Sequence, residues 1–249
     1  EFSQQLAALG EMAAGIAHEI RNPLGSIQLY AQVLVEDLAD QPGSVELCQK
    51  IGTAVNGMES IVRDVLQFAR DTSLHAERIP IGSLLDRMIM DAEGLLATSA
   101  VRLVRDHLAD DQEVEVDSTL MGQAVGNILR NAVESMEKMA PEERIVDLGS
   151  RMIRRTRADG VRQTVVAIRI ADRGCGIPED LVQRLFNPFF TTRATGTGLG
   201  LAIAHRVVDA HRGDIVVAPR EGGGTVFEVH VPIDDPEAND LQADDLEKM

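Results

Sequence analysis

Residues 9–24 have the sequence LGEMAAGIAHEIRNPL, which sets a histidine and a glutamate within an apolar helical pattern. Apolar positions recur around this stretch in alternating steps of three and four residues, as in the seam of a packed helix: Leu6, Leu9, Ala13, Ile16, Ile20, Ile27 and Leu34. In this register His18 falls opposite the seam, with Glu19 beside it and Asn22 one turn later on the same face. The pattern predicts a helix over residues 3–39 that displays His18 rather than burying it.

A second apolar seam follows a turn at residues 40–44 and predicts a helix over residues 45–70. Its members are Leu47, Ile51, Ala54, Met58, Ile61, Val65 and Phe68. A single helical hairpin has nothing against which to bury its apolar stripe, so we expect two copies to close into a four-helix bundle, as a homodimer. Pro23 withholds an amide from the carbonyl of Glu19, so we also expect the first helix to kink or loosen just after His18.

The composition limits the classes of partner and the location. The chain has 249 residues with a formal net charge of -16, one Tyr and no Trp, which argues against nucleic acid as a ligand. Cys48 and Cys175 stand far apart in the sequence, so neither a disulfide framework nor a zinc site is indicated. No apolar run approaches the roughly 18 residues of a membrane span. We expect a cytoplasmic fragment whose sensor or membrane region is missing.

The rest of the chain mixes helical and two-residue periodicity. A polar linker at residues 73–80 precedes predicted helices at 81–98, 118–139 and 198–211. Extended segments are predicted at residues 101–107, 113–116, 146–152, 165–171, 215–217 and 226–231, with a hairpin turn at 158–160. The segment 234–249 has seven acidic residues against one lysine and is expected to be disordered. The fold class is therefore α+β, with a helical hairpin followed by an α/β sandwich.

Two polar patches in this second half can bind a ligand. Asn127 and Asn131 are four residues apart on one face of a predicted helix, where neutral oxygen ligands suit Mg²⁺ bound to phosphates. Asp172 follows an apolar strand directly, and Gly174 and Gly176 after it allow a ligand to approach the backbone. A carboxylate in that position can accept a hydrogen bond from an exocyclic amine.

Two further patches precede the last predicted helix. Residues 186–193, FNPFFTTR, combine apolar anchors with hydroxyl groups and a guanidinium that can meet a phosphate. Residues 196–201, GTGLGL, run straight into the helix and present free amides to an anion. This spacing matches neither the Rossmann nor the Walker fingerprint.

The stretch around His18 and these four patches, taken in order, resemble the transmitter module of sensor histidine kinases. Residues 18–23 resemble its H box, 127–131 its N box, 172–176 its G1 box, 186–190 its F box and 196–200 its G2 box. A last glycine motif, Gly222 to Thr225, stands where the family has its final nucleotide motif. The resemblance implies a dimerisation and histidine phosphotransfer domain at residues 1–72 and a Bergerat-type (GHKL) ATP-binding domain at residues 81–233.

The resemblance also implies roles for individual residues. His18 is the phosphoacceptor, Glu19 polarises its imidazole, and Asn22 positions water in a phosphatase reaction. Asn131, supported by Asn127, holds Mg²⁺, and Asp172 binds the adenine amine of ATP. The remaining nucleotide contacts are expected from Gly174, Gly176, Phe190, Arg193, Gly196, Thr197, Gly198, Leu199, Gly200 and Thr225. The implied partner is the receiver domain of a response regulator.

Alternative functions leave part of the sequence unexplained. A GHKL ATPase without histidine phosphotransfer would use residues 80–233 but not the displayed His18 and Glu19. A zincin is excluded because Asn22 occupies the second histidine position of HExxH. The spelling of the H and G2 boxes is similar to that of nitrogen-regulator-type kinases, although Arg173 replaces a common asparagine in the G1 box.

Overall fold

The computed structural model describes residues 2–69, 73–106, 109–156, 162–193 and 196–233, with the backbone alone at residues 2–19, 69 and 162. The chain divides into two units, each described by itself. The first contains residues 1–72 with Asn187–Leu199, and the second contains Ser73–Phe186 with Gly200–Met249. The predicted hairpin turn at 158–160 and the predicted acidic tail lie outside the described residues.

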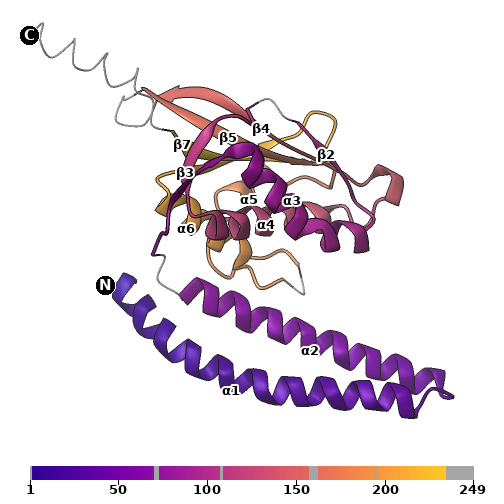
Figure 1. The fold of residues 1–249 in the computed structure, drawn as a ribbon. Coiled ribbons are helices and arrows are strands. Elements are labelled where there is room, and N and C mark those ends of the chain that lie inside the picture. Colours follow the sequence, from indigo (N-terminus) through magenta and orange to yellow (C-terminus); the bar gives the residue numbers. More distant parts are fainter. Residues whose placement is uncertain (1, 70–72, 107–108, 157–161, 194–195, 234–249) are drawn as a thin grey trace, which may run out of the picture. The chain divides into compact units, whose positions relative to one another are not determined.

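The first unit is built on two antiparallel helices, α1 (Phe2–Asp37) and α2 (Pro42–Ala69) (Figure 1). Leu24 and Ala31 on α1 are buried, as are Cys48 and Val55 on α2. The expected loosening after His18 does not interrupt the helix, because α1 remains helical through Pro23. The proline removes one amide donor, and the helix accommodates it within the gentle curve of α1.

The predicted seam does not form the contact between α1 and α2. Its described members on α1 remain exposed, with Ile20 at 39%, Ile27 at 43% and Leu34 at 43% of their full accessible surface. On α2 the exposed large apolar side chains are Leu47, Ile51, Met58 and Ile61. Each helix therefore keeps an apolar stripe that the hairpin itself does not cover.

The second unit begins with a strand inside the predicted linker. β1 (Glu77–Pro80) pairs antiparallel with β3 (Glu113–Val116) in a two-stranded sheet. The polar composition of residues 73–80 predicted no strand, because β1 has an exposed edge and its order depends on pairing with a distant partner.

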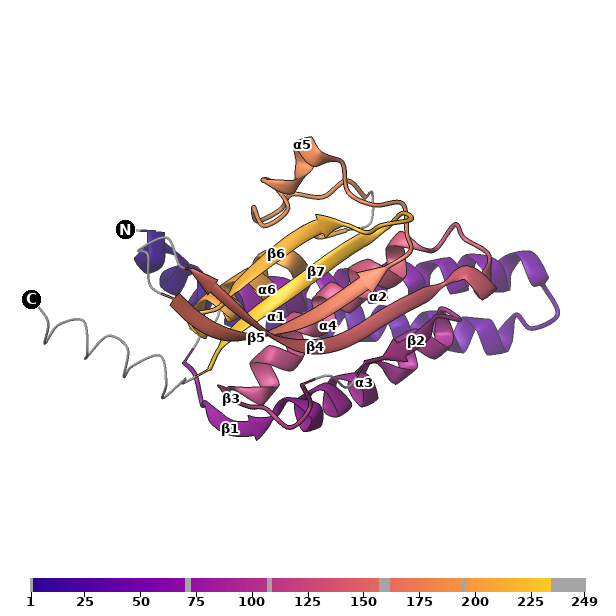
Figure 2. The same ribbon diagram turned by 90° about the horizontal axis from the view of Figure 1, so that it is seen from above.

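A five-stranded sheet forms the body of the second unit, in the order β2-β4-β5-β7-β6 (Figure 2). Its strands are β2 (Arg102–Arg105), β4 (Ile145–Thr156), β5 (Arg162–Asp172), β7 (Thr225–Pro232) and β6 (Asp214–Pro219). β2 is parallel to β4, and the other neighbours are antiparallel. β4 and β5 are longer than predicted because their polar ends still pair, from Val146 opposite Asp172 to Thr156 opposite Arg162.

Three helices lie along one face of this sheet (Figure 1): α3 (Ile81–Thr98), α4 (Ser118–Ser135) and α6 (Gly200–Ala210). The strand side chains on that face alternate with those of the other face, and they include Val146, Leu148, Ile168, Ile170, Phe227 and Val229, all buried. Two short elements that the sequence analysis did not predict complete the unit, η1 (Pro141–Glu143) and α5 (Glu179–Val182). This arrangement is the predicted α+β architecture.

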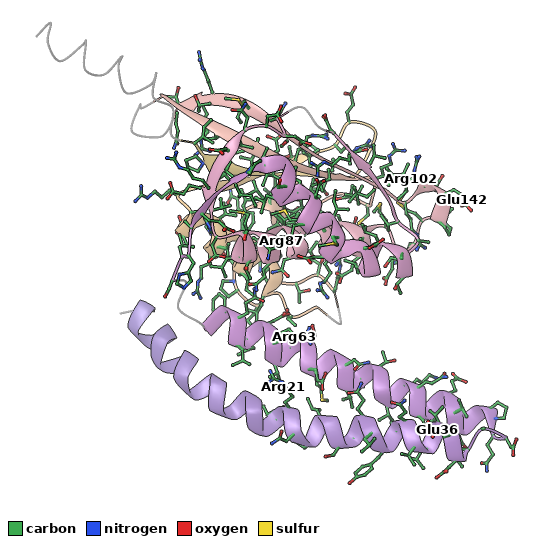
Figure 3. The ribbon with its side chains drawn as sticks, in the orientation of Figure 1. Arg21, Glu36, Arg63, Arg87, Arg102 and Glu142 are labelled. Atoms are coloured by element: carbon green, nitrogen blue, oxygen red, sulfur yellow. The ribbon has the colours of Figure 1, made fainter. Side chains whose placement is uncertain are left out.

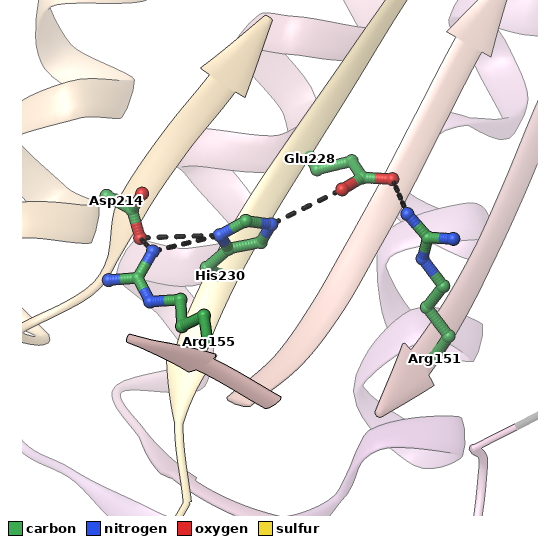
Figure 4. Close-up of polar contacts among 5 residues, drawn as sticks. All are labelled: Arg151, Arg155, Asp214, Glu228 and His230. Atoms are coloured by element: carbon green, nitrogen blue, oxygen red, sulfur yellow. Dashed lines mark hydrogen bonds and ion pairs between the residues drawn. The ribbon is translucent and has the colours of Figure 1, made fainter. Parts of the chain in front are cut away.

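The other face of the sheet carries a charged network (Figure 4). Arg151 Nη2 lies 2.6 Å from Glu228 Oε1, and the second oxygen of Glu228 lies 3.3 Å from His230 Nε2. Arg155 pairs with Asp214, and its Nη1 is 3.0 Å from His230 Nδ1. These contacts link β4, β6 and β7 across β5, where Ala167 is in register with both Arg151 and His230.

Candidate nucleotide and phosphotransfer sites

Asp172 ends β5 and is the most buried charged residue of the candidate site, with 2% of its surface exposed. Its Oδ1 accepts three hydrogen bonds, from Gly174 N at 2.8 Å, Ser135 Oγ at 3.2 Å and Thr225 N at 3.3 Å. Among the described residues no hydrogen bond to Oδ2 is found. One carboxylate oxygen is thus fixed by the protein and the other remains available to accept a hydrogen bond from a ligand.

Burial raises the pKa of Asp172 above its ordinary value, although the hydrogen bonds from Gly174, Ser135 and Thr225 and the charge of Arg220 act in the opposite direction. Desolvation is the dominant cause because the carboxylate is almost completely removed from water. A ligand amine that donates to Oδ2 would relieve part of that cost. The site therefore favours a ligand with an exposed N–H group.

Two glycines allow the backbone to close around Asp172. A Cβ on Gly174 would contact Ser135 Oγ and lie 2.6 Å from Ser135 Cβ, and one on Gly224 would lie 2.8 Å from the carbonyl carbon of Asp172. Gly176 has a φ of +73°, which side chains rarely adopt. Gly174 and Gly176 were predicted from the sequence, whereas Ser135 was not. Ser135 lies four residues after Asn131, as Asn131 does after Asn127. This spacing places all three on one face of a helix and could have indicated Ser135.

Gly174→Ala is expected to displace the backbone amide that holds Asp172 Oδ1. We expect a loss of roughly 1–3 kcal/mol in the free energy of unfolding, the usual cost of overpacking, and weaker nucleotide binding. Thermal unfolding and titration with a fluorescent ATP analogue would measure both. The matched control is Gly122→Ala on α4, where an added Cβ meets nothing within 4 Å. Equal effects of the two substitutions would contradict the steric argument.

α4 places Asn127 and Asn131 on one face, as predicted. The Nδ2 of Asn127 is buried and has no hydrogen-bond partner among the described residues. A buried unpartnered amide group is costly, so it indicates that a further polar group belongs in this position. The Cβ position of Gly200, the first residue of α6, lies 3.7 Å from Asn127 Cγ. The N box is therefore adjacent to Gly200, the last residue of the G2 box.

The segment from Asn187 to Leu199 belongs to the first unit. Within it, a Cβ on Gly198 would lie 2.7 Å from Phe190 N, and Gly198 has a φ of +67°. The F and G2 boxes thus contact each other through a position that only glycine fits. Burial lowers the pKa of Arg193 from its ordinary value. The hydroxyl of Thr197 donates to Asp64 Oδ2 of α2 at 2.8 Å, and nothing in the sequence pattern indicated Asp64.

The candidate phosphotransfer site is described only in part. His18 and Glu19 lie within α1, and their side chains lie outside the described residues, so their arrangement remains a prediction. Asn22 is exposed, and its carbonyl accepts a hydrogen bond from Ser26 Oγ at 3.2 Å. Another histidine, His205, is also exposed, and its ring centroid lies 5.0 Å from that of Phe186.

Two family models match the chain. Residues 8–74 match the His Kinase A (phospho-acceptor) domain, and residues 116–235 match the histidine kinase-, DNA gyrase B-, and HSP90-like ATPase domain. Among curated proteins, the chain is 34% identical to signal transduction histidine-protein kinase AtoS of Escherichia coli over 241 residues, covering 95% of this chain and 37% of that protein. It is 32% identical to sporulation kinase E of Bacillus subtilis, covering 93% of this chain and 29% of that protein.

Solved structures show the same fold. ShkA, determined at full length in complex with AMPPNP, matches with a TM-score of 0.66 and 25% identity over 89% of this chain and 45% of ShkA. Histidine kinase ThkA, in complex with response regulator protein TrrA, matches with a TM-score of 0.61 and 27% identity over 92% of this chain and 63% of ThkA. The chain spans less than half the length of the two curated relatives named above.

Proposed function

Because this chain belongs to the two-component histidine kinases, with a phospho-acceptor domain followed by an ATPase domain, we propose that it phosphorylates itself on His18 with ATP. The phosphoryl group then passes to an aspartate of a response regulator. The observation that carries the ATP-binding part is Asp172, whose Oδ1 is saturated while Oδ2 is available. ThkA in complex with TrrA supports a receiver domain as partner.

In the proposed reaction, a ring nitrogen of His18 attacks the γ-phosphorus of ATP, and the bond from that phosphorus to the bridging oxygen of ADP breaks. Glu19 accepts a hydrogen bond from the N–H of the other ring nitrogen, and this raises the nucleophilicity of the attacking nitrogen. Asp172 accepts a hydrogen bond from the exocyclic amine of adenine, and Arg193 and Thr197 contact the phosphates. When bound, Mg²⁺ would neutralise charge on the transferring group.

Asn131 and Asn127 fit the magnesium role because their amide oxygens add no negative charge beside the phosphates. The unpartnered Asn127 Nδ2 also supports a further polar group on this face of α4. Asn22 would position water when the phosphorylated regulator is hydrolysed.

Membership of the nitrogen-regulator subfamily stays a prediction. In the part of the chain that the structure describes, no helix is long and apolar enough to cross a membrane.

The decisive experiment incubates the purified chain with γ-labelled ATP and Mg²⁺. A phosphoramidate survives alkali and is lost in acid, whereas a serine ester behaves in the opposite way. We expect alkali-stable label on the chain, which an added receiver domain removes. Release of inorganic phosphate without labelled chain would instead favour the GHKL ATPase.

We propose that the chain is a homodimer through the exposed stripes of α1 and α2. Ile27→Glu places a charge in the stripe, where a second copy would bury it at a substantial desolvation cost. The dimer dissociation constant should rise by at least about tenfold, measured by sedimentation equilibrium. Gln32→Glu, at an exposed polar position five residues away, is the matched control. A wild-type chain that sediments as a monomer at all concentrations would refute the proposed dimer.

A further inference from the structure

The segment that enters the second unit is bound by side chains at the start of α4. His75 N donates to Asp117 Oδ2 at 3.0 Å, and Ser118 Oγ donates to Glu77 Oε1 at 2.7 Å. Arg87 of α3, labelled in Figure 3, donates to the same Ser118 hydroxyl at 3.0 Å. Asp117 and Ser118 are both only 7% exposed. These contacts have no part in the nucleotide site described above.

Asp117 divides its two oxygens between two tasks. Oδ1 caps α4 by accepting from Thr119 N at 3.1 Å and Leu120 N at 3.0 Å, while Oδ2 accepts from His75 N. Burial alone would raise the pKa of Asp117, but hydrogen bonds from Leu120, His75 and Thr119 together lower it. The carboxylate therefore remains ionised at neutral pH and can serve both groups of donors.

The same residue is connected to α6. Asp117 N donates to His211 Nε2 at 2.9 Å, and His211 Nδ1 lies 2.7 Å from Val207 O. Because a backbone amide can only donate, Nε2 must be the acceptor and Nδ1 must carry the proton. α4 carries Asn127 and Asn131, and α6 begins at Gly200, the last residue of the G2 box. The entering segment is thus tied to both helices that frame the proposed nucleotide site.

Packing contributes little to this attachment, because Ser73, His75 and Ala76 are exposed, Leu74 is only half-buried, and a cavity of about 400 Å³ adjoins the segment. Leu74 and Ala76 are among the residues that line this cavity, as are Ala210, His211, Pro232 and Ile233. With so little apolar contact, the hydrogen bonds of Asp117 and Ser118 must hold the segment. Removing the Oδ2 acceptor should therefore release it as far as Glu77.

We infer that Asp117 is a positioning residue that anchors the linker between the two domains at His75. The inference rests on the proposed function, in which the ATP-binding domain must reach His18. α2 ends at Ala69, so the anchor leaves residues 70–74 between the domains. Release extends the tether to residues 70–76 and removes its fixed direction. A longer and looser tether lowers the effective concentration of one site at the other.

The test is Asp117→Asn. Asparagine is an equally good helix N-cap, so its oxygen keeps Thr119 N and Leu120 N, while its NH₂ group faces His75 N and cannot accept from it. Hydrogen exchange in residues 73–77 should accelerate by at least about tenfold, while α4 keeps its protection. Lengthening the tether from five to seven residues should lower the autophosphorylation rate at saturating ATP by about twofold, with the ATP dissociation constant unchanged.

Two further variants separate anchoring from folding and charge. His75→Pro removes the donating amide and leaves Asp117 intact, so it should reproduce both effects. Asp111→Asn removes the same charge at an exposed position and should change neither. If the hydrogen-exchange rate of residues 73–77 is the same in Asp117→Asn as in wild type, the inference is overturned. It is also overturned if Asp117→Asn loses both the exchange protection of α4 and the affinity for ATP. The exchange measurement needs no kinase activity, so an inactive wild-type chain would count against the proposed function alone.

Discussion

Asp172→Asn is expected to weaken ATP binding by about 100-fold or more while leaving the unliganded protein at least as stable. The asparagine oxygen can accept the three donors that now converge on Oδ1. Its NH₂ group then replaces Oδ2 and faces the exocyclic amine of adenine, donor against donor. Equilibrium binding of ATP, measured by calorimetry, gives the affinity, and thermal unfolding gives the stability.

The pH dependence of stability provides a second measurement on the same variant. Because the folded pKa of Asp172 lies above the unfolded value, protonation favours the folded state. Its contribution to stability is greatest below 3.8, the ordinary pKa of an aspartate, and is lost as the pH rises through the folded pKa. The neutral asparagine avoids that loss, so its advantage over wild type should exist at neutral pH and disappear on acidification.

The control for this substitution is Asp91→Asn, an exposed position on α3. It should change neither the ATP affinity nor the pH dependence of unfolding. If Asp172→Asn binds ATP as tightly as wild type, the assignment of Oδ2 to the adenine amine is wrong. If it unfolds at a much lower temperature at neutral pH, the carboxylate has a structural role that burial and hydrogen bonding do not explain.

The elements with a regular apolar pattern were predictable from the sequence. The apolar run before Asp172 predicted β5, and the three- and four-residue spacing around Ile51 predicted α2. β1 was missed because residues 77–80 are mostly exposed and become a strand only by pairing with residues 113–116. That a second copy of the chain covers the seam stays a prediction, because the structure describes a single chain.

The site was predictable where spacing or a glycine requirement marks it. Asn127 and Asn131 share a helical face, and Gly174 stands where any side chain would contact Ser135. Ser135 and Asp117 were missed because a single serine or aspartate has many ordinary roles, and theirs depend on residues far away in the sequence. The bond from Asp117 N to His211 Nε2 joins positions 94 residues apart, which no local pattern can indicate.

His18→Gln is expected to abolish the alkali-stable label entirely while ATP binding stays within about twofold of wild type, because glutamine is polar and of similar length but has no nucleophilic lone pair on nitrogen. The nucleotide contacts proposed for Asp172, Gly174 and Thr225 do not involve residue 18. Labelling with γ-labelled ATP and binding of the same nucleotide are measured on one preparation. Label should be lost even at saturating ATP, which distinguishes a missing acceptor from weakened binding.

The matched control is His205→Gln, the same substitution at another exposed histidine. It should retain the label, because His205 lies on α6 with its ring against Phe186 and no carboxylate follows it in the sequence as Glu19 follows His18. Loss of label in His205→Gln but not in His18→Gln would transfer the acceptor role to α6. Loss in both would implicate ATP binding, which the parallel titration detects. Only retention in His205→Gln with loss in His18→Gln agrees with a helix that displays one reactive imidazole beside a carboxylate.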